Sequence, residues 1–390
     1  MQTSRLLRSL LVLSVALLAF APGATRAATL AASGTWTVTG SLHQAHAYET
    51  STLLPNGLVL LVGGANRNGF LATAELYNPR TGSWANTASM HYARIQFTAT
   101  LLRDGQVLVT GGASNNGYPA RAELYNPHTG KWTLTGAMHT PRDFHTATLL
   151  PDGRVLVTGG VAGGCDNNGN CTGITAGAEL YDPRTGRWTV TGSLHQARAR
   201  QTATLLPDGQ VLVTGGSAGG AETAGSDPLA GAELYHPHTG SWATTGSLHT
   251  AAAAQGATLL PNGLVLVEGG SDSRTWITDA ELYHPLTGTW TATGSLHEPR
   301  AYQTGQMATL LPSGQVLVVG GCLTGNCSSV TRTAELYNPS TGVWTVTGSL
   351  HQGRALGPAT LLPGGQVLVP GGSATASFAN ALISAELYHP

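Results

Sequence analysis

The sequence predicts an all-β fold, a seven-bladed β-propeller, and three observations support this prediction. A unit of similar sequence occurs seven times after residue 35, with successive ELY motifs 48 to 56 residues apart. Each unit carries two hairpin patterns, which makes four short strands. No window shows the sustained helical period of apolar residues. A repeat of this length indicates one supersecondary unit per repeat, and four-stranded units can close into a ring.

Three features mark the repeats. The ELY motifs begin at Glu75, Glu123, Glu179, Glu233, Glu281, Glu335 and Glu386. A glycine pair precedes each motif and begins at Gly63, Gly111, Gly159, Gly215, Gly269, Gly320 and Gly371. A tryptophan recurs at Trp36, Trp84, Trp132, Trp188, Trp242, Trp290 and Trp344.

The strands within a unit follow from its turn chemistry. The first predicted hairpin is TATLL, a Pro-Asp-Gly or Pro-Asn-Gly turn and QVLVTGG, because the turn glycine tolerates positive φ. The second is AELYNP, a turn that ends in Thr-Gly, and WTVTG. One Trp strand, residues 34–40, precedes the first unit, and the last unit ends at ELYHP without one. We therefore expect the N-terminal strand to complete the seventh blade, which pairs edges that would otherwise be exposed.

The first residues are predicted to be a signal peptide. Arg5 and Arg8 precede an apolar run from Leu10 to Phe20, which is too short to span a bilayer, and small residues follow. We place the cleavage after Ala27, so that residues 1–27 are the signal peptide and residues 28–390 are a single propeller. The mature protein is expected to be secreted or held in the cell envelope, without membrane insertion, and to be monomeric.

The four cysteines form two close pairs in the exported part of the chain. An even number at short spacing in an oxidising compartment favours two disulfides, Cys165–Cys171 and Cys322–Cys327. The alternative is a metal site, but each pair supplies two thiolates and no nearby histidine. We therefore predict no metal and no cofactor. With 19 basic and 20 acidic residues, the chain also lacks the basic surface that nucleic acid requires.

The order of these motifs is informative about the family. A Gly-Gly pair, a Tyr-containing strand, a Thr-Gly turn and a Trp strand resemble the kelch repeat, as in the central domain of galactose oxidase. With the leader segment, the resemblance suggests an exported bacterial type. It implies that the glycine pair ends the second strand, and that the repeated tryptophans and tyrosines pack between blades. These tyrosines are Tyr77, Tyr125, Tyr181, Tyr235, Tyr283, Tyr337 and Tyr388.

Residues present in every unit are interpreted as scaffold, because one ligand site does not need seven copies. They include the ELY glutamates and one histidine after each Trp strand. These ring histidines are His43, His91, His139, His195, His249, His297 and His351. Adjacent blades would hold equivalent histidines about 10 Å apart, too far to share a metal ion.

Candidate binding residues lie where the units differ. Between the glycine pair and the ELY glutamate there are 10, 10, 18, 16, 10, 13 and 13 residues. Variable loops on a rigid scaffold commonly carry binding residues. These loops contain both cysteine pairs and the polar residues Asn66, Arg67, Asn115, Asn116, Asp272 and Arg274. Trp276 lies outside the repeat, and is either a contact residue or a cap on a neighbouring loop.

A second candidate set follows the ring histidines. The third residue after each is arginine in five units (Arg94, Arg142, Arg198, Arg300, Arg354), and His46 or Ala252 in the other two. The family resemblance implies that the following positions contact ligands at the channel mouth. They are Tyr48, Glu49, Gln96, Phe97, Asp143, His145, Arg200, Gln201, Gln255, Tyr302 and Gln303. The alternative is that they line a water-filled funnel.

Two classes of function are compatible with these residues. Polar and aromatic side chains at a concave mouth favour a binding propeller with a carbohydrate or protein ligand. The alternative is a carbohydrate-active enzyme of the mutarotase or lyase type, with acid and base groups among Glu49, Asp143, His145 and Glu268. A copper oxidase is less favoured, since it would need two tyrosines, two histidines and a cysteine joined to a tyrosine. No nucleophile motif or phosphate loop occurs, which supports binding.

Overall fold

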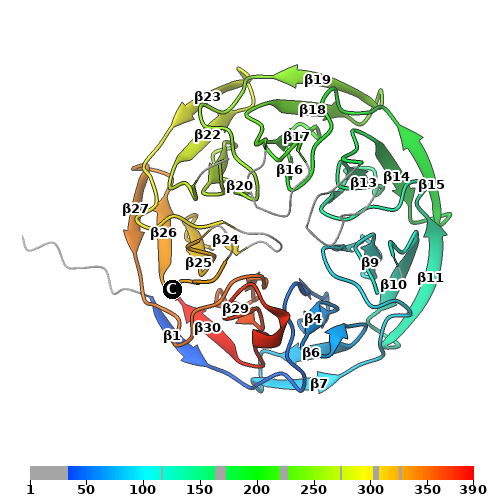
Figure 1. Ribbon diagram of the computed structural model, residues 1–390, viewed down its shortest axis with the longest axis vertical. Coiled ribbons are helices and arrows are strands. Elements are labelled where there is room, and N and C mark those ends of the chain that lie inside the picture. The colour runs from blue at the N-terminus through cyan, green and yellow to red at the C-terminus, as the bar shows by residue number, and fades with distance from the viewer. Residues whose placement is uncertain are drawn as a thin grey trace, which may run out of the picture. The chain divides into compact units, whose positions relative to one another are not determined.

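Each repeat folds into one antiparallel sheet of four strands, and the turn glycines permit its sharp reversals. In the computed structural model, Gly105 and Gly209 in the first turn have φ of 84° and 86°. A side chain is strained at such angles, so glycine is needed there. The structure describes residues 34–115, 117–162, 173–219, 227–272, 275–301, 307–324 and 327–390. Figure 1 shows that the seven sheets stand as blades around a central axis.

The blades are numbered here in chain order, from the innermost to the outermost strand. The innermost strands are β2 (Thr50–Leu53), β8 (Thr98–Leu101), β12 (Thr146–Leu149), β16 (Thr202–Leu205), β20 (Gly256–Leu259), β24 (Ala308–Leu310) and β28 (Thr360–Leu361). The second strands are β3 (Val59–Val62), β9 (Val107–Thr110), β13 (Val155–Thr158), β17 (Val211–Thr214), β21 (Val265–Glu268), β25 (Val316–Val319) and β29 (Val367–Pro370).

The outer half of each blade carries the ELY and Trp motifs. The third strands are β6 (Ala74–Asn78), β10 (Arg121–Asn126), β14 (Ala178–Asp182), β18 (Ala232–His236), β22 (Ala280–His284), β26 (Ala334–Asn338) and β30 (Ala385–His389). The outermost are β7 (Ser83–Asn86), β11 (Lys131–Ala137), β15 (Arg187–Thr191), β19 (Ser241–Thr245), β23 (Thr289–Ala292), β27 (Val343–Val346) and β1 (Thr35–Val38). A small hairpin, β4 (Ala65–Asn66) and β5 (Gly69–Phe70), and a short 3-10 helix, η1 (Phe378–Asn380), lie in loops.

The N-terminal strand closes the ring, as the sequence predicts. Strand β1 pairs with β30 of blade 7 and places Trp36 opposite Tyr388. The indole Nε1 of Trp36 donates a hydrogen bond of 2.7 Å to the carbonyl of Gly348. In Figure 1 the first strand lies beside the last one. Blade 7 is therefore built from both ends of the described chain.

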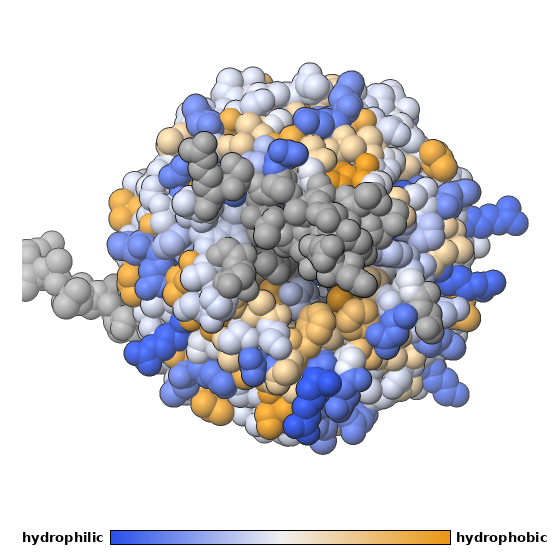
Figure 2. All heavy atoms as spheres, in the orientation of Figure 1, coloured by the Kyte–Doolittle hydropathy of each residue, from blue (hydrophilic) through white to orange (hydrophobic). Residues whose placement is uncertain are grey.

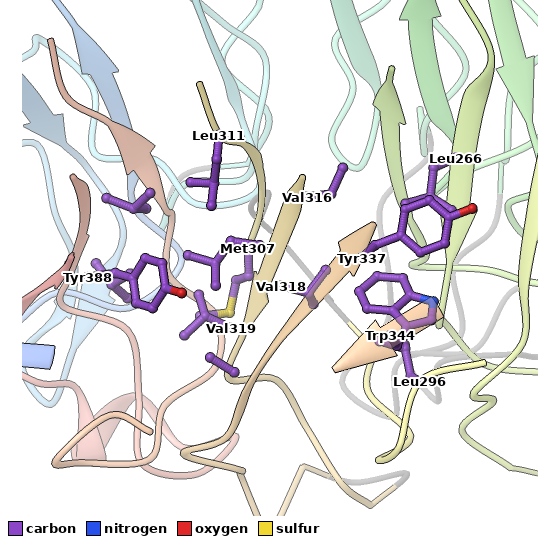
Figure 3. Packing of buried hydrophobic residues seen from close by; sticks show 14 of the residues in the cluster. Leu266, Leu296, Met307, Leu311, Val316, Val318, Val319, Tyr337, Trp344 and Tyr388 are labelled. Atoms are coloured by element: carbon purple, nitrogen blue, oxygen red, sulfur yellow. The ribbon is translucent and has the colours of Figure 1, made fainter. Parts of the chain in front are cut away.

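The repeated aromatic residues form the core between blades, which confirms the implication of the family resemblance. Tyr337 is fully buried, and its ring centroid lies 5.1 Å from that of Trp344. Figure 3 shows this pair beside Leu266 and Leu296, which belong to the preceding blade's side of the cluster. The Tyr337 hydroxyl is 2.8 Å from the Thr293 hydroxyl of that blade. Each such tyrosine thus combines apolar burial with a polar tether.

The ring histidines and ELY glutamates also belong to the scaffold. In blade 4, the carboxylate of Glu233 accepts hydrogen bonds from Nδ1 of His195 (2.7 Å) and Nη2 of Arg198 (3.0 Å). The same histidine–glutamate bond occurs in all seven blades. It ties the connection between two blades to the third strand of the next one. The interpretation of these histidines as structural is confirmed.

One of the two predicted disulfides falls within the described residues. Cys322 and Cys327 are joined in the loop of blade 6. Cys165 and Cys171 lie outside the described residues, as does the predicted signal peptide. Within the described part of the chain, no helix is long and apolar enough to cross a membrane.

Candidate binding site at the channel mouth

The start of each innermost strand is held by backbone hydrogen bonds in two directions. In blade 4, Ala199 exchanges two hydrogen bonds with Ser217 of its own blade, of 3.0 and 2.8 Å. The next residue, Arg200, donates its N–H to the carbonyl of Phe144 in blade 3 (3.0 Å). Ala254 in turn donates to Arg200, and Tyr48 donates to Leu356. The blades are therefore linked to one another at the mouth of the channel.

The residues that make these links share an uncommon backbone conformation. We call them the mouth ring: Tyr48 (φ 62°), Gln96 (55°), Phe144 (49°), Arg200 (58°), Ala254 (56°) and Leu356 (62°). Residues other than glycine rarely adopt positive φ, and the neighbouring structure must hold them there. The backbone of the mouth ring is thus repeated, while its side chains are all different.

The mouth ring opens onto a cavity of about 350 Å³ along the channel. Tyr48, Gln96, Phe144 and Arg200 all line it, above the threonine, serine and alanine side chains of the innermost strands. The guanidinium of Arg200 lies 4.3 Å from the ring centroid of Phe144, which is a cation–π arrangement. Gln96 and Arg200 are half-buried, so both can reach a molecule in the cavity.

The residue after five of the six mouth-ring positions packs between two blades and also lines the cavity. We call this the wedge position: Glu49, Phe97, His145, Gln201 and Gln255. Gln201 donates to the carbonyl of Thr158, and Gln255 to that of Thr214, both at 2.9 Å in the preceding blade. A Cβ on Gly159 would collide with the Gln201 side chain. In the same way, the first glycine of the pair makes room for the wedge residue of the next blade at Gly63, Gly111, Gly215 and Gly371.

Glu49 is a wedge residue with an altered protonation equilibrium. It is 1% exposed, and its Oε1 accepts the N–H of Gly372 at 2.8 Å. Its Oε2 has no hydrogen-bond partner among the described residues. Burial raises the pKa of Glu49 to about 8, although the hydrogen bond from Gly372 and the charge of Arg354 act against this. The carboxyl group is therefore mostly protonated at neutral pH.

His145 is the wedge residue of blade 3, and its pKa is shifted downward, opposite to that of Glu49. Its Nε2 lies 3.1 Å from the hydroxyl of Thr98 and 3.3 Å from that of Thr110. Burial, together with the charges of Arg142 and Arg94, lowers the pKa of His145 to about 3. The imidazole is therefore neutral at neutral pH. Among the described residues that line the cavity, Arg200 is left as the charged group.

Glu268 is buried at the end of β21 and meets no arginine among the described residues. Neither carboxylate oxygen has a hydrogen-bond partner there, and burial raises the pKa of Glu268 well above its usual value. The residue opposite it is Gly256, where a Cβ would collide with the carboxyl group. In blades 2 to 4, two threonines face each other at these positions. Blade 5 has Gly256 and Glu268 instead, one smaller and one larger than threonine.

The loop residues predicted from the sequence have several fates. Asn66 is 6% exposed, and its side chain bonds to Ala45 and Asn68, which shapes the loop rather than facing a ligand. Asp272 accepts the N–H of Thr275 at 2.6 Å. The others divide into exposed residues (Arg67, Asn115), a buried one (Asp143) and residues outside the described part of the chain (Asn116, Arg274, Tyr302, Gln303).

Trp276 is not an exposed contact residue. It is 9% exposed and belongs to a buried cluster with Ala301, Cys322 and Cys327 of blade 6. It therefore caps the neighbouring loop, which was the other interpretation. Glu49, Asp143 and His145 are 1 to 7% exposed, so we expect truncation of these side chains to lower stability as well.

An apolar patch adjoins the mouth. Figure 2 shows hydrophobic residues near the centre of the ring, over the region where Figure 1 places β4 and β29. The ring of Phe378 lies 5.3 Å from that of Tyr48 and 6.0 Å from that of Phe70. These contacts join the loops of blades 7 and 1 above the mouth ring.

Three residues of the mouth ring were missed from the sequence. Phe144, Ala254 and Leu356 are apolar and do not look like ligand contacts. Each is the fifth residue after a ring histidine, and so is Tyr48. Counting five residues from the ring histidine finds all six members, and in the sixth unit the same count gives Tyr302, which lies outside the described residues.

Comparison with known proteins supports the family and the fold. A model of the Kelch motif matches residues 47–91, which is about one repeat. No curated protein matches the chain. A solved structure of a fungal alcohol oxidase of the AA5 family, in complex with copper, is similar with a TM-score of 0.74 and 20% identity. The alignment covers 92% of this chain and 76% of that one. At this identity the likeness shows the fold alone.

The described residues do not fit a copper centre of that kind. No three histidine, cysteine, aspartate or glutamate side chains come together as metal ligands within the described ranges. Tyr235 is followed directly by His236, but Tyr235 is buried with its hydroxyl 2.9 Å from that of Thr191, and His236 ends strand β18.

Proposed function

Because this chain is a seven-bladed β-propeller of kelch repeats, we propose that it is an exported binding protein that takes a carbohydrate ligand at the channel mouth. One observation carries the proposal. The mouth ring repeats its backbone in six blades and presents a different side chain in each. A scaffold requirement would explain the shared backbone but not the varied side chains.

The chemistry of the cavity supports a sugar. A volume of about 350 Å³ lies within the range of small-molecule sites. The wall offers hydroxyl groups of serine and threonine, the amide of Gln96 and the guanidinium of Arg200, with the rings of Tyr48 and Phe144 beside them. Neutral hydroxyls suit a wall in which Glu49 is protonated and His145 is neutral. Arg200 would favour a sugar that carries a carboxylate.

Export is part of the same proposal. The N-terminal segment has the charge and the short apolar run of a secretory signal. The Cys322–Cys327 disulfide is compatible with an oxidising compartment. N-terminal sequencing of protein recovered from the medium or periplasm tests the cleavage after Ala27.

A glycan array followed by calorimetry with the best hit tests the ligand class. We expect wild-type protein to bind, Arg200→Ala to lose about 1.5–3 kcal/mol of binding free energy, and Gln96→Ala, whose amide is neutral, to lose about 0.5–1.5 kcal/mol, the typical costs of a lost charged and a lost neutral hydrogen bond. His128→Ala is the control, because His128 is exposed in a turn on the opposite face. Equal losses from His128→Ala and Arg200→Ala would place the ligand elsewhere. If no glycan on the array binds, and a protein binds through the same mouth residues instead, the ligand is a protein and not a carbohydrate.

A carbohydrate-active enzyme of the mutarotase or lyase type is the second candidate. It is favoured by one observation, namely that a protonated carboxyl group (Glu49) and a neutral imidazole (His145) line the same cavity. Interconversion of the α and β anomers of reducing sugars, followed by polarimetry, tests mutarotation, in which a proton leaves the anomeric hydroxyl and another reaches the ring oxygen as the C1–O5 bond breaks. Loss of this activity in Glu49→Gln with retained sugar binding would support the enzyme, while turnover equal to the buffer rate would dismiss it.

A further inference from the structure

Five blades enclose an arginine side chain in the same slot. In blade 4, Nη1 of Arg198 donates to the carbonyls of Gly215 (2.9 Å) and Gly231 (2.7 Å), and Nη2 donates to Glu233 (3.0 Å). Equivalent bonds are made by Arg94, Arg142, Arg300 and Arg354. All five guanidinium groups are buried. We call this arrangement of one carboxylate and two carbonyl groups the guanidinium slot.

Blade 5 has the walls of the slot without the arginine. Its equivalents of Gly215, Gly231 and Glu233 are Gly269, Asp279 and Glu281, but Ala252 replaces the arginine. The backbone frame is kept, since Gly269 still donates to the carbonyl of Asp279 at 3.0 Å. No side chain among the described residues takes over the bonds that Arg198 makes in blade 4.

The carboxylate of Glu281 shows the effect of the missing cation. In the five arginine blades, the ring histidine N–H bonds to Oε2 alone, because Oε1 is turned toward the guanidinium. In blade 5, the N–H of His249 is shared between Oε1 (3.0 Å) and Oε2 (3.1 Å) of Glu281, and Glu75 shares the N–H of His43 in the same way in blade 1, which also lacks the arginine. Glu281 is also 5% exposed, against 0 to 2% for the other ELY glutamates. The carboxylate is hydrogen-bonded but lacks its buried positive partner.

Blade 1 also lacks the arginine, and its slot is filled. His46 places Nδ1 2.7 Å from the carbonyl of Gly63 and Nε2 3.8 Å from Oε1 of Glu75. An imidazole therefore replaces the guanidinium there. Ala252 offers no polar atom in its side chain, so blade 5 differs from every other blade in this respect.

The rim of the slot has changed together with its centre. A Cβ on Gly177, the rim residue of blade 3, would lie 3.6 Å from Nη2 of Arg142. This position is occupied by Thr73, Arg121, Gly177, Gly231, Thr333 and Ser384 in the other blades. In blade 5 it is Asp279, which is exposed and accepts a hydrogen bond of 2.8 Å from Thr250. Blade 5, which has Ala252 in place of the buried arginine, thus carries an acidic side chain, Asp279, at the outer edge of the slot.

We propose that the slot of blade 5 binds the guanidinium group of an arginine, either free or within a polypeptide. Glu281 and the carbonyl of Gly269 would accept its N–H groups from the inside, as Glu233 and Gly215 do for Arg198. Asp279 would accept from the rim, where the ligand enters. A planar guanidinium suits this site better than an ammonium because its donors form a fixed fork. The site is separate from the channel mouth, and the proposal does not rest on the carbohydrate ligand.

N-ethylguanidinium is the direct probe, because it has the heavy atoms of an arginine side chain beyond Cβ. Calorimetry and thermal melting of the wild-type protein should show saturable binding and a rise in melting temperature at millimolar concentration. N-ethylammonium, its control, should give a much smaller response. Ala252→Arg fills the slot from within, so this variant should melt higher than wild type and lose the response. Glu281→Gln should weaken binding on the order of tenfold, as expected for a lost charge-assisted hydrogen bond.

Arg198→Ala is the matched control in the neighbouring blade. This variant empties a slot that a guanidinium fills in the wild-type protein, so N-ethylguanidinium should partly restore the melting temperature of the variant. If this variant responds while wild type and Ala252→Arg behave alike, the slot of blade 5 is closed and the proposal is overturned. Free arginine and an arginine-containing peptide, compared with its citrulline counterpart, then separate the two sources of the ligand. Binding of the citrulline peptide with equal affinity would also contradict the proposal.

Discussion

Blade 4 carries two arginines only two residues apart, and they do different work. Arg198 is 1% exposed, and its guanidinium donates hydrogen bonds to Glu233 and to two backbone carbonyl groups of its own blade. Arg200 is half-buried, stacks on Phe144 of blade 3 and lines the channel cavity. Five blades have the first arginine, and only blade 4 has the second. Repetition within one chain therefore separates residues that hold the fold in most blades from residues that vary between blades, which are the candidates for ligand contact.

The largest effect should come from opening the ring. Deletion of residues 34–40 removes β1, which leaves β30 as an unpaired edge and exposes the core side of Tyr388. The truncated protein should aggregate or lose most of its cooperative unfolding transition. Size-exclusion chromatography and calorimetry measure both. A monomer with unchanged melting would show that blade 7 does not need this strand.

The next largest effect should come from the scaffold arginine. Arg198→Ala leaves the carboxylate of Glu233 buried without its cation, which typically costs about 3–5 kcal/mol of unfolding free energy. Chemical denaturation measures this loss. The double variant Arg198→Ala with Glu233→Gln should recover part of it, because the unpaired charge is then removed. A single variant as stable as wild type would mean that the slot tolerates an empty centre, as Ala252 does in blade 5.

Glu49 should make the protein less stable as the pH rises. Its pKa is about 8 in the folded state against 4.5 in the unfolded chain, so between these values unfolding releases a proton that the native state retains. Stability attributable to Glu49 is therefore present below pH 4.5 and is lost as the pH rises through 8, on the order of a few kcal/mol. Glu49→Gln should remove this dependence, since Gln201 and Gln255 show that glutamine fits a wedge position. Parallel pH profiles of the two proteins would contradict the prediction.

His145 should produce the opposite dependence. Its pKa is about 3 in the folded state against 6.5 in the unfolded chain, so the unfolded state takes up a proton first. Stability attributable to His145 is present above pH 6.5 and is lost as the pH falls toward 3. His145→Gln should flatten the acid limb of the profile and leave the alkaline limb unchanged. If the stability of His145→Gln falls as steeply toward low pH as that of wild type, other titratable groups cause the loss.

Much of the fold was predictable, because each repeat confirms the others. The positions of Tyr337, Trp344 and their equivalents follow from the period, their packing between blades is what the kelch resemblance implies, and closure by residues 34–40 follows from the unmatched Trp strand. The site was less predictable because the direction of a side chain at the mouth depends on backbone conformation. Gln96, which has positive φ, and Phe97 are neighbours in sequence and both line the cavity, yet the Phe97 ring packs into the core between blades 1 and 2 while Gln96 stays half-buried. Composition carries no signal for that difference.

The most direct test of the account compares the two arginines of blade 4 in one experiment. Unfolding free energy and binding to the best array ligand are measured for Arg198→Ala and Arg200→Ala. Arg200→Ala should weaken binding by about 1.5–3 kcal/mol and change the unfolding free energy by less than about 1 kcal/mol. Arg198→Ala should lose several times more stability than Arg200→Ala, with the mouth still able to bind at temperatures where the variant is folded. Unchanged binding by Arg200→Ala, with binding abolished in folded Arg198→Ala, would contradict the division between a repeated scaffold and a non-repeated site.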